Sequence, residues 1–511
     1  MVNKVYSNRI SEYAHENGGR VIILLLLFLL AIYEFLHSGY STFAIICISP
    51  LAIIFTFITF KNKFLVFWLL IVVNWFIQFK NINFHMPMSL PDELLEVFLI
   101  AVAIIDTRFT PHFDRIWNLM LYAIFIWFVF CLLEILNDTC GIGININAWF
   151  TGARLMALQL VWIILVFTLY ISNPKTLMTY LRIWAGLSIF SAFWTWKMIN
   201  FGFTDAENAW LYSVGYVTHI INGGSLTRYW STFSDAANYG CNASASAVAF
   251  LIFGITSKVK KDKIYFLFAA AVVIWGMFQS GTRTAMVTLI AGFMVFLVLA
   301  KSFKIMVPSA IAGAFLLIIL IFTNIGNGNQ QIRRMRTAFR SENDASSKVR
   351  DINKTAISKY MQDAPWGVGI GMFSENIPAW NKFKKVTEIP PDSEYVFIWV
   401  RTGIIGVSVF AACMAMIFIG GCMVVLFKLK NKSLIGIGGG LCSAFVAIQL
   451  GGYGNQVIYQ YPNGLTFFGG MAIVYLLPYI EKEWIEYEQQ RIAKQEAERR
   501  LKRIKKLAKR V

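Results

Sequence analysis

Long apolar runs recur along almost the whole sequence, and they limit the possible fold more than any other feature. A helix needs about 17 to 25 mainly apolar residues to cross the ~30 Å hydrocarbon layer of a membrane. Runs of about this length can be read at roughly 21–37, 42–60, 64–79, 92–106, 116–136, 156–173, 177–196, 238–257, 264–279, 284–300, 305–323, 403–427, 434–453 and 465–480. The sequence therefore predicts an all-α polytopic membrane protein with fourteen transmembrane helices.

The composition agrees with this fold class. Hydrophobic residues make up 57% of the chain and charged residues 14%, whereas soluble domains contain about 25% charged residues. The apolar run from Val21 has no small-residue cleavage site and is followed by many similar runs, so we expect it to be a membrane span and not a signal peptide. The seven cysteines show no metal-ligand spacing, and no cluster of His, Cys or paired acids is visible. We expect neither a metal nor a cofactor.

The positions of Lys and Arg predict the orientation, because short cytoplasmic loops carry an excess of these residues. One alternating set of connections contains Lys61 and Lys63, Arg108 and Arg115, Lys175, Lys258 to Lys263, Lys301 and Lys304, and Lys428 to Lys432. Placing these connections in the cytoplasm, with fourteen crossings, puts both termini there as well. The tail 481–511 is rich in helix formers and ends in a basic run, so we expect a solvated helix whose end touches anionic membrane lipid.

This topology divides the chain into four parts. Residues 1–323 form transmembrane helices 1 to 11, 324–402 form a large extracytoplasmic loop before the twelfth, 403–480 form helices 12 to 14, and 481–511 form the tail. The large loop carries eleven Lys or Arg against seven Asp or Glu between Asn324 and Ser393. Its stretch APWGVGIGMF, residues 364–373, predicts a packed and sharply turning segment shaped by Gly367, Gly369 and Gly371.

Arg283 lies between two apolar runs, in the stretch FQSGTRTAMVTLIAGF. An unpaired charge at membrane depth costs several kcal/mol, so such arginines usually mark a ligand or an ion path. The alternative is that Arg283 extends from a helix end to the lipid headgroups. The predicted topology places Arg283 at the outer membrane edge, on the same side as Arg228 and Arg350.

Three stretches, in this order and on this side, resemble a known family. They are RYWSTFSDAANYGCNASASAVAFLIFG (228–254), SGTR (280–283), and SSKVRDINKTAISKYMQDAPWGVGIGMF (346–373) followed by PPDSEYVFIWVRTGIIG (390–406). Together they resemble the O-antigen polymerase and O-antigen ligase superfamily of bacterial cell-envelope glycosyltransferases. The resemblance covers about 225–410 and implies an inverting, metal-independent enzyme of the bacterial inner membrane.

The resemblance also implies the reaction and its partners. Such enzymes move a glycan from undecaprenyl diphosphate to an acceptor hydroxyl, and the fork of donors on arginine fits diphosphate oxygens. Arg228, Arg283, Arg350 and Arg401 are the candidate donor-binding residues, and Arg283 and Arg350 are also candidates to stabilise charge during catalysis. The implied partners are the lipid-linked oligosaccharide donor and acceptor, membrane lipids and a chain-length regulator protein, with no nucleic acid.

The acceptor hydroxyl must lose a proton as it attacks, and a carboxylate can take it. Asp392 or Glu394 is the candidate base, although Glu394 could pair with Arg401, and both could be ordinary acids at a helix start. Related ligases show His-Asn where this chain has Asp392 and Ser393. This difference favours a polysaccharide repeat-unit polymerase, for O-antigen lipopolysaccharide, capsule or exopolysaccharide, over a ligase that transfers glycan to lipid A core. A flippase or other transporter is less favoured, because the two halves show no internal repeat.

Overall fold

The computed structural model describes residues 61–82, 89–106, 112–221, 226–301, 303–323, 330–336 and 345–508, with a few isolated positions besides. The predicted spans 21–37 and 42–60 lie almost wholly outside these ranges. Residue contacts divide the chain into two units, Met1–Val66 and Phe67–Val511, and the helices that follow Phe67 belong to the second unit.

Helices make up most of the described residues, which confirms the all-α class. Up to the first strand they are α4 Lys63–Phe76, α5 Leu90–Ile105, α6 Leu119–Leu133, α7 Ile146–Ala153, α8 Gln159–Tyr170, α9 Pro174–Phe201, α10 Asp205–Trp210 and α11 Tyr216–His219. A π-turn, Arg154–Leu158, joins α7 to α8. Strands β1 Ile220–Ile221 and β2 Leu226–Thr227 form a short antiparallel pair.

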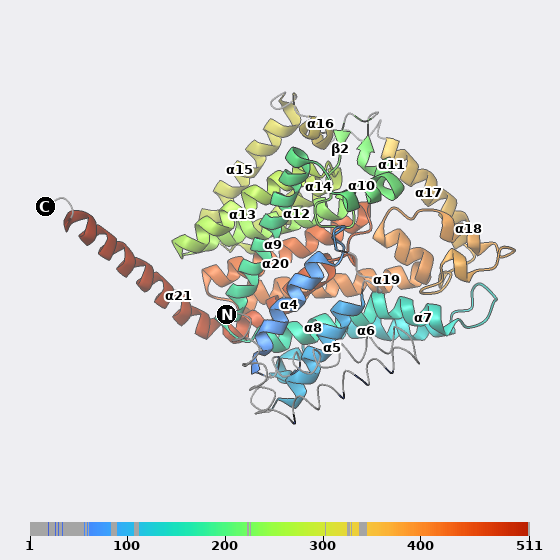
Figure 1. Ribbon diagram of the computed structural model, residues 1–511, viewed down its shortest axis with the longest axis horizontal. Helices are drawn as coiled ribbons and strands as arrows, with labels where there is room; N and C mark the ends of the chain where they lie inside the picture. The colour runs from blue at the N-terminus through green and yellow to red at the C-terminus, as the bar shows by residue number, and fades with distance from the viewer. Residues whose placement is uncertain are drawn as a thin grey trace, which may run out of the picture. The chain divides into compact units, whose positions relative to one another are not determined.

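The second half of the chain continues in the same way. Its helices are α12 Ala236–Thr256, α13 Lys260–Gln279, α14 Arg283–Leu299, α15 Phe303–Phe322, α16 Gln330–Arg336, α17 Ala345–Met361, α18 Phe383–Glu388, α19 Glu394–Met423, α20 Lys432–Gly454 and α21 Gly469–Ala508. Figure 1 shows α17 and α18 together at one side of the helical bundle, next to the start of α19. The predicted large loop therefore contains helices.

Seven helical segments of the described ranges are long and apolar enough to cross a membrane. They are Leu119–Leu136, Ile146–Tyr170, Ala236–Thr256, Lys260–Gln279, Glu394–Lys428, Lys432–Gly454 and Gly464–Leu501. Shorter apolar helices occur at Lys63–Phe76, Arg283–Leu299 and Met306–Phe315. The chain is thus a polytopic membrane protein, and the total of fourteen spans stays a prediction.

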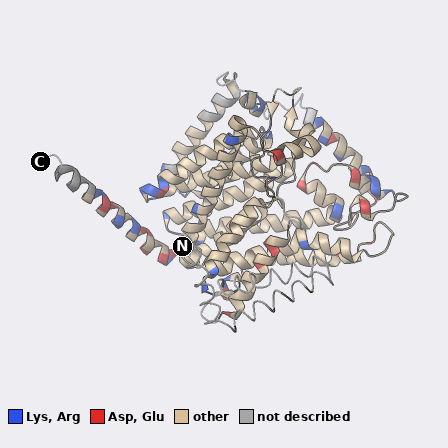
Figure 2. Cartoon of the chain, in the orientation of Figure 1, with Lys and Arg blue, Asp and Glu red and all other residues tan. Residues whose placement is uncertain are grey.

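The centre of the bundle is built on small residues. Helix α12 packs against α9, α13, α14 and α20, and Figure 1 shows these helices side by side. Gly, Ala and Ser are frequent in α12 and α20, and they let helix backbones approach closely where lipid supplies no hydrophobic driving force. A methyl group on Gly292 of α14, for example, would lie 2.9 Å from the carbonyl oxygen of Ser443 in α20. Charged residues are sparse on these central helices in Figure 2.

Helix α19 begins at Glu394, nine residues before the predicted span at 403. The backbone at Gly403 has φ 67° and ψ −173°, which interrupts the helix at the predicted start. The amide of Gly369 donates to the carbonyl of Arg401 at 3.1 Å, and that of Val368 donates to the carbonyl of Val400 at 2.9 Å. The glycine-rich segment therefore satisfies backbone groups that the break exposes.

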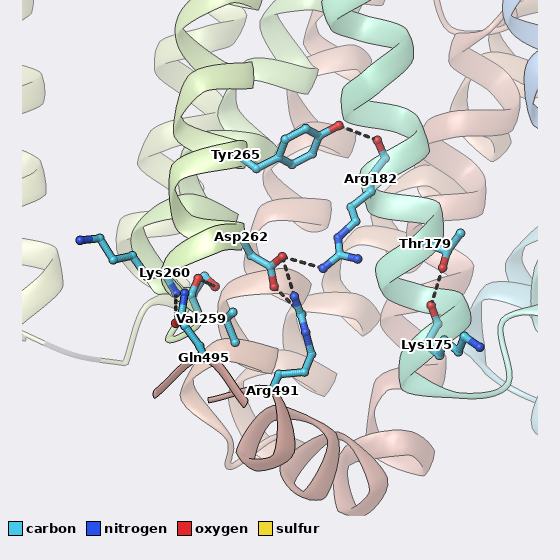
Figure 3. Close-up of polar contacts among 10 residues, drawn as sticks. Lys175, Thr179, Arg182, Val259, Lys260, Asp262, Tyr265, Arg491 and Gln495 are labelled. Atoms are coloured by element: carbon cyan, nitrogen blue, oxygen red, sulfur yellow. Dashed lines mark hydrogen bonds and ion pairs between the residues drawn. The ribbon is translucent and has the colours of Figure 1, made fainter. Parts of the chain in front are cut away.

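Helix α21 extends well beyond the bundle in Figure 1, and polar contacts hold its middle part, from Trp484 to Arg491. Glu488 accepts from Lys258 at 2.7 Å, and the indole of Trp484 donates to Ser433 at 2.9 Å. Asp262 at the start of α13 pairs with both Arg491 of α21 and Arg182 of α9, as Figure 3 shows. The tail is helical up to Ala508, and its first turns are docked against predicted cytoplasmic connections.

Candidate functional site

Arg228 follows β2 directly and holds the loop that precedes Arg283. Its guanidinium donates from Nε to the carbonyl of Ser280 at 3.3 Å and from Nη2 to Oγ1 of Thr282 at 3.1 Å. A third bond runs from Nη1 to the carbonyl of Thr218 at 2.9 Å. The loop turns at Gly281, whose φ is 58°, a value that glycine adopts without steric cost. Arg228 thus fixes the path of the chain into α14.

Arg283 is the first residue of α14, and it is half-buried. Burial lowers the pKa of the neighbouring Arg228, Asp235 opposes that shift, and the positive charges of Arg283 and Arg350 add to it. Two like charges lower the pKa of a third only when they are close. The structure therefore brings Arg228, Arg283 and Arg350 into one electropositive neighbourhood.

Arg350 reaches the same place from α17. Its Nη2 lies 3.4 Å from Oδ1 of Asn455, the residue that ends α20. The amide of Asn455 in turn donates to Oγ1 of Thr284 at 3.2 Å, one residue after Arg283. Asn455 therefore links the two arginine-bearing helices, α14 and α17.

Asp392 lies near this link, because a hydrogen bond from Asn353 holds its side chain there. Asn353 lies one turn after Arg350 on α17, and its Nδ2 donates to Oδ2 of Asp392 at 2.8 Å. Asp392 is half-buried and its φ is 54°, in the left-handed region that few residues other than glycine adopt. Such backbone conformations cost about 1 to 3 kcal/mol and are concentrated at functional sites.

Glu394 has different surroundings from Asp392. Its side chain is buried, with 4% of its surface exposed, and Oε2 accepts the backbone N–H of Ile458 at 3.0 Å. Ser393 donates to the carbonyl of Gly452 at 3.1 Å. Glu394 and Ser393 thus attach the start of α19 to the end of α20 and to the following loop.

Three helix starts meet around the arginines. Thr282, at the cap of α14, donates to the carbonyl of Ala236 in the first turn of α12. Helix α19 begins at Glu394, beside the loop that follows α20. Helix starts carry partial positive charge. At the start of α12, the first backbone N–H groups already donate to His219 and to the carboxylate of Asp235. Arg228, Arg283 and Arg350 therefore lie near these helix starts, with Asp235 as an acid beside them.

His219 caps the start of α12, close to Arg228. Its Nε2 accepts the backbone N–H of Ala236 at 3.0 Å, and Nδ1 lies 3.0 Å from the carbonyl of Gly215. Burial and the charge of Arg228 lower the pKa of His219 to about 4. The ring is therefore neutral, with Nε2 as acceptor, at neutral pH.

Arg401 has a separate set of contacts. The side chain is 4% exposed, and its guanidinium carbon lies 4.1 Å from the ring centre of Phe373 and 5.3 Å from that of Phe397. In the described part of the chain, no ion pair joins Arg401 to Glu394, and Nε and Nη1 of Arg401 have no hydrogen-bond partner.

The glycines at 367, 369 and 371 all have positive φ, at 80°, 107° and 78°. A methyl group on Gly367 would lie 2.5 Å from backbone atoms of Arg401 and Gly403, so only glycine fits against the helix break. Gly371 packs equally closely on the backbone of α7. These three positions shape the segment between α7 and α19.

Residues 267–411 match the family model described as O-antigen ligase. The matched segment contains Arg283, Arg350, Asp392 and the glycine-rich segment. The chain carries an O-antigen ligase family domain. This confirms the resemblance to the O-antigen polymerase and ligase superfamily, whose members are membrane glycosyltransferase-like enzymes. No curated protein matches the chain.

Several polar residues of the site were not identified from the sequence. They are Thr282, Thr284, Asn353 and Asn455. Asn353 could have been found from its spacing, because it lies three residues after Arg350 on the same helix face. Asn455 lies outside the matched segment, and its role depends on how α20 ends beside α14.

Proposed function

We propose that this protein is a polysaccharide repeat-unit polymerase that acts on the outer face of a bacterial inner membrane. It transfers a glycan from polyprenyl diphosphate to a sugar hydroxyl. The observation that carries the proposal is the shared electropositive neighbourhood of Arg228, Arg283 and Arg350 at the starts of α12 and α14. A lipid diphosphate presents about two negative charges at the membrane edge, which these groups would balance.

The three arginines then have different tasks. Arg228 already donates to Thr218, Ser280 and Thr282, so it positions the loop before Arg283. Arg283 and Arg350 lie on either side of the Thr284–Asn455 link and bind the diphosphate oxygens. Their guanidinium groups stabilise the charge that develops as the diphosphate leaves.

The reaction is a single displacement. The acceptor oxygen attacks the anomeric carbon and forms the new glycosidic bond, while the bond from that carbon to the diphosphate oxygen breaks. The bonding electron pair leaves with the lipid diphosphate, and the hydroxyl proton passes to the carboxylate of Asp392. Attack opposite the leaving group inverts the anomeric configuration. Asn353 orients the carboxylate, and Asp392 is more accessible than the buried Glu394.

Glu394 and Arg401 have structural tasks in this proposal. The bond from Ile458 to Glu394 keeps the loop after α20 in place, and with it Asn455. Arg401 packs against Phe373 and the glycine-rich segment, which supports a role in holding that segment and not in binding the donor.

A reconstituted assay tests the proposal. Purified protein in vesicles is given a polyprenyl-diphosphate-linked oligosaccharide, alone or with lipid A core. A polymerase extends the lipid-linked chain into a ladder when no core is present, and it releases one polyprenyl diphosphate for each bond formed. Transfer only to the core would make the protein a ligase. Export of intact glycan lipid without any new glycosidic bond would make it a transporter.

A further inference from the structure

Four polar side chains from three helices form a buried cluster away from the arginines. Asn74 comes from α4, Asp92 and Glu96 from α5, and Gln159 from the start of α8. Asn74 is 1% exposed, and Asp92 and Glu96 are 0% exposed. The π-turn Arg154–Leu158 lies immediately before Gln159, and such turns often occur at functional sites.

Hydrogen-bond donors are too few for the acceptors in this cluster. Asp92 Oδ2 accepts from Asn74 at 2.9 Å and from Gln159 at 3.0 Å, and Glu96 Oε2 accepts from the same Gln159 nitrogen at 3.0 Å. The amide oxygens of Asn74 and Gln159 and the second carboxyl oxygens of Asp92 and Glu96 are buried without a hydrogen-bond partner among the described residues. Buried polar atoms normally have partners, so the cluster lacks hydrogen-bond donors.

The nearby arginine does not supply them. Arg154 donates to Glu93 at 3.3 Å and to Ser89 at 3.1 Å, so its charge is balanced by Glu93. Among the described residues, Glu93, Arg154 and Tyr461 are charged or titratable groups close to the pair. Two fully buried carboxyl groups thus have only amide partners in this part of the chain, and two buried negative charges without a counter-ion would be very costly.

Glu207 shows how this protein surrounds a buried carboxylate with donors and a cation. It is also 0% exposed, but it accepts from Asn81 at 3.0 Å, Trp194 at 2.8 Å and the backbone of Thr204 at 2.8 Å. Lys197 lies 3.6 Å away and supplies the opposite charge. Within the described ranges, Glu207 has both the donors and the cation that the Asp92–Glu96 pair lacks.

We propose that Asp92 and Glu96 form a proton-binding site, in which at least one of the two carboxyls is protonated at neutral pH. The O–H of that carboxyl donates to one of the unpartnered oxygens, which reduces both the net charge and the excess of acceptors. A metal cation would need several convergent ligands. In the ranges described, no group of three or more His, Cys, Asp or Glu is arranged to hold a metal ion.

The site lies close to the loop that follows α20. Burial, followed by the charges of Asp92, Glu93 and Glu96, raises the pKa of Tyr461 in this loop. The same loop carries Asn455, the partner of Arg350, and Ile458, the partner of Glu394. Loss of the proton would place net negative charge beside a segment that shapes the arginine site.

Infrared spectroscopy of the purified full chain in lipid nanodiscs tests the proposal without any transferase assay. At neutral pH the native protein should show the carbonyl band of a protonated carboxyl, shifted in deuterated water. The band should weaken or vanish in Glu96→Gln and in Asp92→Asn, which are nearly isosteric. Both variants should keep the apparent melting temperature of the native protein, because neutral amides replace groups that share a proton.

Glu207→Gln is the matched control, because it removes an equally buried acid that has a cation. It should leave the band unchanged. Two results would overturn the proposal. In the first, neither single variant reduces the intensity of the protonated-carboxyl band that the native protein shows at neutral pH. The other is a band that disappears when sodium replaces choline in the buffer, together with a sodium-dependent gain in melting temperature, which would make the pair a sodium site.

Discussion

Asn353 donates a hydrogen bond of 2.8 Å to the carboxylate of Asp392, and it lies one helical turn from Arg350. One face of α17 therefore contacts both the candidate base and, through Arg350 and Asn455, the start of α14. The proposed proton acceptor and the proposed anion-binding group therefore both contact the same helix. If the proposed reaction is right, this helix sets the distance between the attacking hydroxyl and the leaving diphosphate.

Arg283→Lys keeps the charge at the start of α14 but removes the fork of donors. If Arg283 binds the diphosphate through two parallel bonds, the rate of polymer formation should fall by about 10-fold or more. Membrane insertion and melting temperature should stay normal. The measurement is glycan transfer by the purified variant, with Arg333→Lys on the exposed side of α16 as control. If both variants transfer glycan at the native rate, Arg283 does not bind the diphosphate and instead extends from the helix end to the lipid headgroups.

Sidedness can be measured with single cysteines in a version that lacks the seven native ones. Lys354→Cys lies on the exposed surface of α17, and Lys494→Cys lies on the exposed surface of α21. The proposed topology predicts that a membrane-impermeant maleimide labels position 354 in intact spheroplasts and position 494 only after lysis. The reverse pattern would place the arginine site in the cytoplasm, where the proposed reaction has no donor.

Gly367→Ala should destabilise the protein more than a comparable change elsewhere. The new methyl group would lie 2.5 Å from backbone atoms of Arg401 and Gly403, at a residue with φ 80°. Gly141→Ala is the control, since Gly141 has φ 62° and no atom within 4 Å of an added methyl group. The control should cost about 1 kcal/mol for its backbone alone, and Gly367→Ala about 1 to 3 kcal/mol more. Equal melting temperatures would show that the segment is free to move away from α19.

We expect the folded protein to lose stability in acid because of His219. Its pKa is lowered to about 4 in the folded protein, from an ordinary value of 6.5. Between these values the unfolded chain binds a proton that the folded chain does not, so stability falls as the pH drops from 6.5 towards 4. The full effect is at most about 3 kcal/mol. The apparent melting temperature should therefore fall less on acidification in His219→Gln than in the native protein, and an identical fall would contradict this role.

Some of this arrangement could be predicted from the sequence and some could not. Apolar length predicts helices such as α12 and α20 well, because about twenty apolar residues have few other uses. The predicted span starts at 403 whereas α19 starts at 394, because residues 394–402 include Glu394 and Arg401 and nothing local shows that both side chains are buried. The cluster of Asp92, Glu96 and Asn74 was also not predictable, because its members come together only when α4, α5 and α8 pack.

The sequence indicates which residue types gather here, but not which of them contact the protein itself. Arginine at a membrane edge indicates an anion whichever helix carries it, so Arg228, Arg283 and Arg350 could be chosen from the sequence. Whether an arginine binds a ligand or the protein itself depends on nearby backbone carbonyls, such as those of Ser280 and Thr218 around Arg228. The same limit applies to Asp392 and Glu394, which are two residues apart but have different burial.

The most direct test of the central claim is a comparison of Asp392→Asn with the native protein, measured as both donor binding and turnover. Purified protein in vesicles is given lipid-diphosphate-linked oligosaccharide, and the bound donor and the new glycosidic bonds are quantified. Asp392→Asn should bind donor normally, because the arginines are unchanged, and turn over about 10² to 10⁴ times more slowly. Asp351→Asn, an exposed acid on the same helix as Asn353, should behave like the native protein. Turnover by Asp392→Asn within about threefold of native would contradict the account, since loss of a general base costs far more.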